Sequence, residues 1–159
     1  MIIGNPYEIA IHIEQIDFLC SPSGIFNFII NDTLIPGKGV TVDLYIVISS
    51  LKESLESGLE NLEHTIEKRP IEKIDFSDGN PKGFISLNVA ELHDYGCVFW
   101  LGFNDNKDRL IYSLDFEKTF SEVYFSHGTV EKLVKKLPKS DNLIMDKADG
   151  VIITRLADN

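Results

Sequence analysis

The sequence predicts an α+β domain with a largely antiparallel sheet, built from an N-terminal hairpin plus a four-strand meander and covered by two helical segments. Four apolar segments follow one another with short polar breaks, at residues 84–89, 97–103, 110–116 and 123–125. Two other regions, near 44–68 and 129–137, repeat apolar residues at helical spacings. Strands grouped in runs, without strict strand–helix alternation, are typical of this class. We expect residues 1–159 to form a single domain.

The first strand of the hairpin is predicted over residues 7–18. Ile9, Ile11 and Ile13 share one parity, so they lie on one face of a strand. Ile16 and Phe18 take the other parity, and one extra residue in a strand reverses all later side chains. A bulge or bend is therefore expected near Glu14 and Gln15.

The second strand of the hairpin is predicted over residues 25–30, which are apolar on both faces apart from Asn27. Residues 21–24 (Ser-Pro-Ser-Gly) precede it as a turn. Residues 31–33 (Asn-Asp-Thr) turn the chain into Leu34-Ile35, and the Pro-Gly pair at 36–37 ends the segment. These residues predict the hairpin at the start of the chain.

The first helix follows a short strand pattern at residues 40–44. Its apolar stripe has spacings of three and four and consists of Leu44, Val47, Ile48, Leu51, Leu55, Leu59, Leu62 and Ile66. The helix begins near Leu44 or, if Ser50 and Glu53 form a capping box, at Ser50. Gly58 is expected to weaken or break it, and Arg69-Pro70 to end it.

The meander follows a short predicted strand at residues 71–76 and a loop at 77–83. Its first strand, 84–89, alternates apolar and polar residues like a half-buried strand. Its second, 97–103, is apolar on both faces, as expected for a strand inside a covered sheet. Residues 104–108 are a polar turn cluster.

The C-terminal part is predicted to contain one short helix and one strand. Val130, Leu133, Val134 and Leu137 fall at i, i+3, i+4 and i+7, and Pro138 stops the helix. Residues 151–154 form the predicted strand.

Composition and charge narrow the function classes. The net charge of −10 disfavours direct nucleic-acid binding, because phosphate contacts need a basic surface. No apolar run reaches the ~20 residues that span a membrane, and no signal peptide is visible, so we expect a cytoplasmic protein that does not bind membranes. Cys20 and Cys97 lie among apolar residues and are expected to be buried thiols.

No residue pattern supports catalysis, a metal or a cofactor. His12 and Glu14 lie on one face of a predicted strand and lack the cysteine pair of a zinc deaminase. Glu91, His93 and Asp94 are close in sequence, but no further histidine or cysteine pair completes a metal site. The chain also lacks a nucleophile-elbow motif. We therefore expect a protein that is not an enzyme.

The N-terminal segment resembles the immunity protein 42 family. The resemblance lies in Gly4-Asn-Pro-Tyr7, the strand of Ile9, Ile11 and Ile13, and residues 24–31 with Leu34-Ile-Pro-Gly37, and covers about the first 40 residues. Members of this family are small bacterial cytoplasmic proteins encoded beside polymorphic toxins, including those of contact-dependent inhibition systems. The resemblance implies stoichiometric inhibition of one cognate toxin C-terminal domain, often a nuclease, with no cofactor.

A toxin partner needs a complementary surface, and charge complementarity speeds association. The candidate interface residues are the helix glutamates and two turn acids: Glu53, Glu56, Glu60, Glu63, Asp105 and Asp108. Two alternatives remain. One is a small-molecule-binding protein with a cavity lined by Phe26, Phe28, Trp100 and Phe103. The other is an adaptor domain with several partners. The oligomeric state is not predicted.

Overall fold

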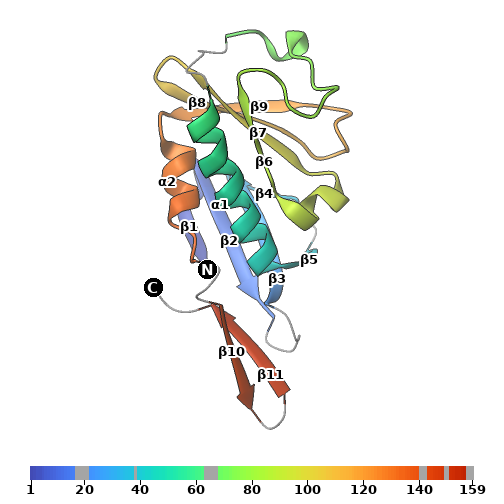
Figure 1. Ribbon diagram of the computed structural model, residues 1–159, viewed down its shortest axis with the longest axis vertical. Helices are drawn as coiled ribbons and strands as arrows, with labels where there is room; N and C mark the ends of the chain where they lie inside the picture. The colour runs from blue at the N-terminus through green and yellow to red at the C-terminus, as the bar shows by residue number, and fades with distance from the viewer. Residues whose placement is uncertain (17–21, 38, 63–67, 140–142, 149–150, 157–159) are drawn as a thin grey trace.

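A computed structural model of the protein describes residues 1–16, 22–37, 39–62, 68–139, 143–148 and 151–156, the last two ranges by their backbone only. The α+β class is confirmed (Figure 1). The hairpin and the meander belong to two separate sheets. The first sheet contains β1 (Ile2–Asn5), β2 (Ile9–Gln15), β3 (Ser23–Ile30), β4 (Thr33–Ile35) and β5 (Thr41–Asp43). The second contains β6 (Phe84–Leu87), β7 (Val98–Asn104), β8 (Lys107–Ser113) and β9 (Ser121–Ser126).

The first sheet has the order β1-β2-β3-β4, and β5 also pairs with β3. The predicted hairpin is its centre, with Ile11 opposite Phe28 in the register of β2 and β3. β1 was not predicted, because Gly4-Asn-Pro6 has the composition of a turn. The expected bend after Glu14 coincides with the end of β2, and Phe18 lies outside the described residues.

The turns of this sheet agree with the sequence in one place and differ in another. Asn31 and Asp32 adopt positive φ angles of 48° and 63°, and Asn and Asp tolerate this conformation in a tight hairpin. In contrast, β3 already begins at Ser23, so Ser23 and Gly24 are strand residues and the predicted turn at 21–24 is wrong in its second half. A side chain at Gly24 would collide with the carbonyl oxygen of Glu14 on β2.

Helix α1 (Leu44–Asn61) begins at the first of the two starts predicted from sequence, and it ends earlier than predicted. Asp43 is its N-cap, and its Oδ1 accepts a hydrogen bond from the Ile46 amide at 3.1 Å. The capping box at Ser50 is therefore wrong. The helix passes through Gly58 without a break and ends before Leu62, so Pro70 does not terminate it.

Helix α1 packs across both sheets (Figure 1). Its buried residues share one core with the inner faces of the two sheets. In this core the ring centroids of Phe28 and Phe99 lie 4.5 Å apart. Lys52 on α1 donates to the carbonyl oxygens of Leu137 and Pro138 at 2.6 and 3.1 Å, which ties α1 to the chain after α2.

The predicted meander is confirmed as the sheet β6-β7-β8-β9. Its outer face carries a second core of Ile74, Phe76, Phe84, Trp100 and Ile111. The segment that covers this face was predicted as a strand over 71–76. It instead begins with a 3-10 helix (Ile71–Lys73), and single apolar side chains reach the sheet from irregular backbone.

Helix α2 (Thr129–Lys135) confirms the predicted C-terminal helix, and its apolar residues Val130, Leu133 and Val134 are buried. The predicted strand at 151–154 lies within β11 (Val151–Leu156), which pairs with β10 (Leu143–Ala148). In Figure 1 this hairpin extends away from the two sheets. None of the helices in the described ranges is long and apolar enough to cross a membrane.

Candidate functional site

The residues considered for catalysis or metal binding are dispersed over the fold. His12 is on β2, His93 is on the 3-10 helix Ala90–Tyr95, and His127 precedes α2. Within the described part of the chain, no three His, Cys, Asp or Glu side chains are arranged to hold a metal ion. Cys97 is buried, as predicted, whereas Cys20 lies outside the described residues.

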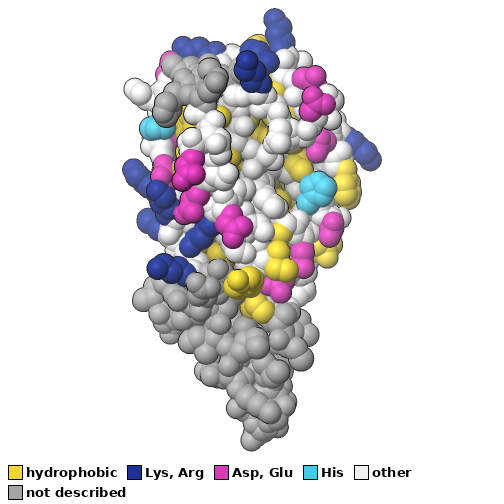
Figure 2. Space-filling model, in the orientation of Figure 1, with side chains coloured by type: hydrophobic (Ala, Val, Ile, Leu, Met, Phe, Trp, Pro, Cys, Tyr) yellow, Lys and Arg dark blue, Asp and Glu magenta, His cyan; other side chains and the backbone are white. Residues whose placement is uncertain are grey.

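The acidic ridge of α1, which we define as Glu53, Glu56 and Glu60, is exposed. Figure 2 shows acidic side chains on this face with basic ones close by. Burial lowers the pKa of Lys52, and the charge of Glu56 acts in the opposite direction. Hydrogen bonding to Glu131 raises the pKa of Lys135, and Glu56 adds to that shift. The negative charge of Glu56 therefore interacts with the positive charges of both Lys52 and Lys135. Glu63 lies outside the described residues.

The two predicted turn acids have different environments. Asp105 is in the β7–β8 turn with a φ of 52°, and its exposed carboxylate forms a 2.9 Å ion pair with Lys68. Asp108 is a residue of β8 and is fully buried, so its description as a turn acid is wrong. Its two carboxylate oxygens accept the amides of Gly128 and Val130, each at 2.9 Å. Asp108 therefore caps α2, and it cannot contact a partner.

A groove of about 660 Å³ runs beside the edge strand β6. We call it the α1–β6 groove. Its α1 wall consists of Ser54, Ser57, Gly58, Asn61 and Leu62. The other side contains Gly79, Asn80 and Glu117, and residues 84–89 lie between the walls. His93 also lines the groove. In Figure 2 a band of mostly uncharged surface runs between acidic side chains on the left and a histidine on the right, which has apolar and further acidic side chains around it.

The α1 wall has a sequence signal that was not used. Ser54, Ser57, Gly58 and Asn61 stand at i, i+3, i+4 and i+7, so small polar residues form a second stripe beside the apolar one. A stripe of this kind allows close approach of another element. The apolar stripe and the glutamates dominate the sequence pattern of this helix, so the groove was not predicted.

The β8–β9 loop beside the groove is held by Asp115. The Asp115 carboxylate accepts the backbone amide of Thr119 at 2.9 Å and its hydroxyl at 2.7 Å. These bonds, with weaker contributions from Ser113 and Lys118, lower the pKa of Asp115 to about 2. The same loop contains Phe116 and Glu117 with positive φ angles of 60° and 61°. Positive φ is uncommon for residues other than glycine, and such conformations cluster at functional sites.

Replacing Thr119 with Val is expected to raise the pKa of Asp115 above about 2 and leave it below 3.8. The variant loses the hydroxyl bond to Asp115, but the backbone amide at position 119, which is the leading cause of the shift, still donates. A carboxyl group with a lower pKa in the folded state stabilises the fold above its unfolded pKa. This contribution declines as the pH falls from 3.8 toward 2. Carbon-13 NMR titration of the Asp115 carboxyl measures the shift. The Thr41→Val variant, altered on β5, should leave it unchanged, and an unchanged Asp115 pKa in Thr119→Val would contradict the assignment.

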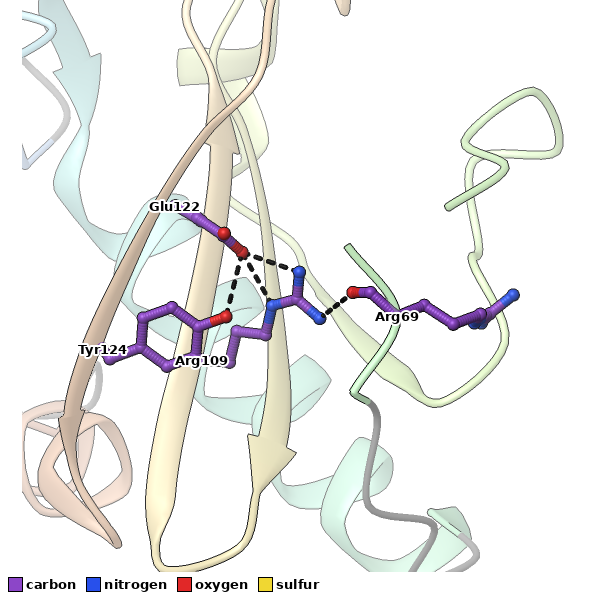
Figure 3. A network of polar contacts seen from close by, with 4 residues as sticks. All are labelled: Arg69, Arg109, Glu122 and Tyr124. Carbon is purple, nitrogen blue, oxygen red and sulfur yellow. Dashed lines mark hydrogen bonds and ion pairs between the residues drawn. The ribbon is translucent and has the colours of Figure 1, made fainter. Parts of the chain in front are cut away.

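A buried arginine joins the loop after α1 to the second sheet (Figure 3). The Arg109 guanidinium forms an ion pair with Glu122 at 2.7 Å and donates to the carbonyl oxygen of Arg69 at 2.7 Å. It also lies over the rings of Phe84 and Tyr124. Burial raises the pKa of Tyr124. These contacts fix the segment that covers the outer core, so we assign this network a structural role.

The aromatic cavity of the small-molecule alternative is not formed. Phe26 and Phe28 are buried in the core under α1, whereas Trp100 belongs to the second core on the opposite face of the second sheet. Phe103 packs against the first core. Alternate residues of β7 point to opposite faces, so Trp100 and Phe103 cannot line one cavity.

Comparisons with known proteins agree with the N-terminal resemblance and extend it. The model of the family described as Immunity protein 42 matches residues 1–140. An uncharacterised protein of Pasteurella multocida is 25% identical, with 72% of this chain and 83% of that protein aligned. The crystal structure of CdiI from Burkholderia dolosa has a similar fold, with a TM-score of 0.59 and 19% identity. The match covers 85% of this chain and 96% of that one.

Proposed function

The chain belongs to the immunity protein 42 family, and from this premise we propose that it binds and neutralises a cognate bacterial toxin domain. Inhibition is stoichiometric and non-catalytic, and it takes place in the cytoplasm. The observation that carries this proposal is the family match, which extends from β1 through α2. The rigid core beneath α1 supports it, because an inhibitor of this kind requires a fixed surface and no reacting group.

The proposed partner is the C-terminal domain of the protein encoded immediately upstream, called here the neighbouring toxin domain. A net charge of −10 favours a basic partner, such as a nuclease domain, over nucleic acid itself. The proposed contacts are the acidic ridge with Asp105, and Glu63 as its continuation in sequence. Asp108 is not one of the proposed contacts, because it is buried.

The test of the function is expression of the neighbouring toxin domain in bacteria with and without this chain. We expect growth arrest that this chain relieves, and a 1:1 complex of the purified proteins in calorimetry. A toxin domain that arrests growth equally with and without this chain would contradict the proposal. A harmless domain that does not bind would also contradict it.

Reversing two charges of the acidic ridge is expected to weaken the complex. We choose Glu53→Lys with Glu60→Lys. Glu56 is left unchanged, because its charge already interacts with those of Lys52 and Lys135. Exposed charges act mainly on the association rate. The association rate constant should fall about tenfold at low salt and less in 0.5 M salt. Stopped-flow fluorescence measures both.

The matched control is Glu14→Lys with Glu72→Lys, which changes the net charge equally at exposed positions on β2 and on the 3-10 helix Ile71–Lys73. An equal decrease in both double variants would assign the effect to net charge alone. An unchanged rate in the ridge variant would remove this ridge from the interface.

A further inference from the structure

We propose that the α1–β6 groove receives an extended, basic segment of the toxin, which pairs with the backbone of Ser86 as an added strand. This inference rests on the proposed function and specifies the site at which the partner binds. Three features carry it: the open edge of β6, the small side chains of the groove walls, and the acidic groups that border them.

The open edge follows from the alternation of hydrogen bonds along β6. In an antiparallel pair, the backbone groups of successive residues point alternately toward and away from the neighbouring strand. The amide of Phe84 bonds to the carbonyl oxygen of Pro81, and the amide of Asn88 bonds to the hydroxyl of Ser54. Neither partner is in β7, so both amides point away from it.

Ser86 has the same parity as Phe84 and Asn88, so its amide and carbonyl also point away from β7. β6 is the edge strand of its sheet, and Ser86 is exposed in the groove. No hydrogen bond of the Ser86 backbone to a residue outside the sheet is seen within the described residues. The groove therefore presents one donor and one acceptor at the spacing that an added strand uses.

The groove walls admit a main chain because they carry small side chains. On α1 the wall offers two serine side chains and Gly58, where the helix comes so close to Ile85 that a methyl group would not fit. On the opposite side Gly79 and Asn80 border the groove. The aromatic residues of the lining, Phe84, Phe99 and Trp100, are buried in the two cores. The exposed part of the walls therefore suits an extended chain, which needs narrow walls with hydrogen-bonding groups, better than a flat cofactor.

Charge selects the segment that enters. Glu53 and Glu60 are four residues before and three residues after Ser57, so they lie on the helix surface next to the groove wall. Glu117 lines the opposite side. An added strand directs its side chains alternately to both sides, so lysine or arginine side chains on either side meet a carboxylate. The occupant is therefore an extended segment rich in basic residues.

The test replaces Ser86 with Pro in the full chain. Proline removes only the outward amide and is tolerated in edge strands where that amide does not pair. The dissociation constant for the neighbouring toxin domain should rise at least about tenfold, because the toxin carbonyl loses its donor. Ser86→Ala keeps the amide and should bind like the wild type. Unchanged binding by Ser86→Pro would overturn the proposal.

Two further measurements keep the test decisive if Ser86→Pro unfolds. Ser57→Trp fills the groove from an exposed position of α1 and should weaken binding at least about tenfold, since no new strand fits. Ser49→Trp is the control, because Ser49 is on the same helix but outside the groove lining, and this variant should bind like the wild type. In the wild-type complex, NMR hydrogen exchange at the Ser86 amide should slow at least about tenfold. An unprotected Ser86 amide in the complex, or full binding by Ser57→Trp, would overturn the proposal.

The wild type separates this proposal from the proposed function. If the wild type protects cells and binds the neighbouring toxin domain, but the groove variants bind equally well, the function stands and the groove is not the site. If the wild type neither binds nor protects, both are rejected.

Discussion

Replacing Asp108 with Asn is expected to destabilise the protein by about 3 kcal/mol. The two oxygens of the buried carboxylate accept the Gly128 and Val130 amides. Asparagine has a single side-chain acceptor, so one buried amide loses its partner and faces an NH₂ group. An unsatisfied buried group costs about 1–3 kcal/mol, and the charge-assisted bonds that are lost are about twice as strong as neutral ones.

Among the described residues, no other side chain at the start of α2 replaces the cap that Asp108 supplies, so its loss reduces the stability of the fold. Gly128 is the N-cap of α2 and has no side chain to cap the helix. The carboxylate of a strand residue performs this role across a separation of 20 and 22 residues. His127 lies beside the same carboxylate, with its Nδ1 at 3.4 Å. Loss of the cap should therefore loosen α2 first.

Thermal unfolding followed by circular dichroism measures the loss, and a decrease of roughly 10 °C in Tm is expected for a chain of this length. Hydrogen exchange at the Val130 amide should accelerate as well. Asp105→Asn is the matched control, because it removes the same charge from the exposed turn and should change stability by less than about 0.5 kcal/mol. Equal stability of the two variants would refute the capping role.

Replacing Gly58 with Ala is expected to cost about 2 kcal/mol, although alanine is the better helix former. A Cβ atom at Gly58 would lie 2.2 Å from Cγ2 of Ile85 and 3.0 Å from its Cβ and Cγ1. Overpacking of a core typically costs about 1–3 kcal/mol, and the closeness of this contact places it at the upper end. The gain in helix propensity offsets about 1 kcal/mol.

A second substitution reverses the sign of this effect. Ile85→Ala removes the Cγ2 and Cγ1 atoms and costs about 2–5 kcal/mol by itself. In that background, Gly58→Ala should stabilise the protein by up to about 1 kcal/mol, since the propensity gain remains and the main collision is gone. Urea unfolding of the four proteins in this cycle gives the coupling. If Gly58→Ala destabilises the protein equally in both backgrounds, the contact with Ile85 does not cause the loss of stability.

The sequence alone determined the elements in which apolar residues repeat regularly. The meander of β6 to β9, the pairing of β2 with β3, and α2 were all predicted, because burial of one face imposes a period of two on strands and of about 3.6 on helices. The family resemblance also came from sequence, since Gly4-Asn-Pro-Tyr7 and Leu34-Ile-Pro-Gly37 are distinctive as residue patterns.

Only the tertiary structure decided features that join residues distant in the chain. The N-cap of α1 is Asp43 and not Ser50. The Asp43 amide also donates a hydrogen bond to the carboxylate of Glu91, 48 residues away, and this contact fixes the start of the helix. The charge of Asp108 suggested an exposed turn acid, yet its carboxylate is buried at the start of α2.

The groove beside Ser86 depends on the edge position of β6 and on its distance from α1. Periodicity reports which face of an element is buried, but not which element covers it. Partners, caps and edges are therefore set by packing between segments, and local sequence leaves them open.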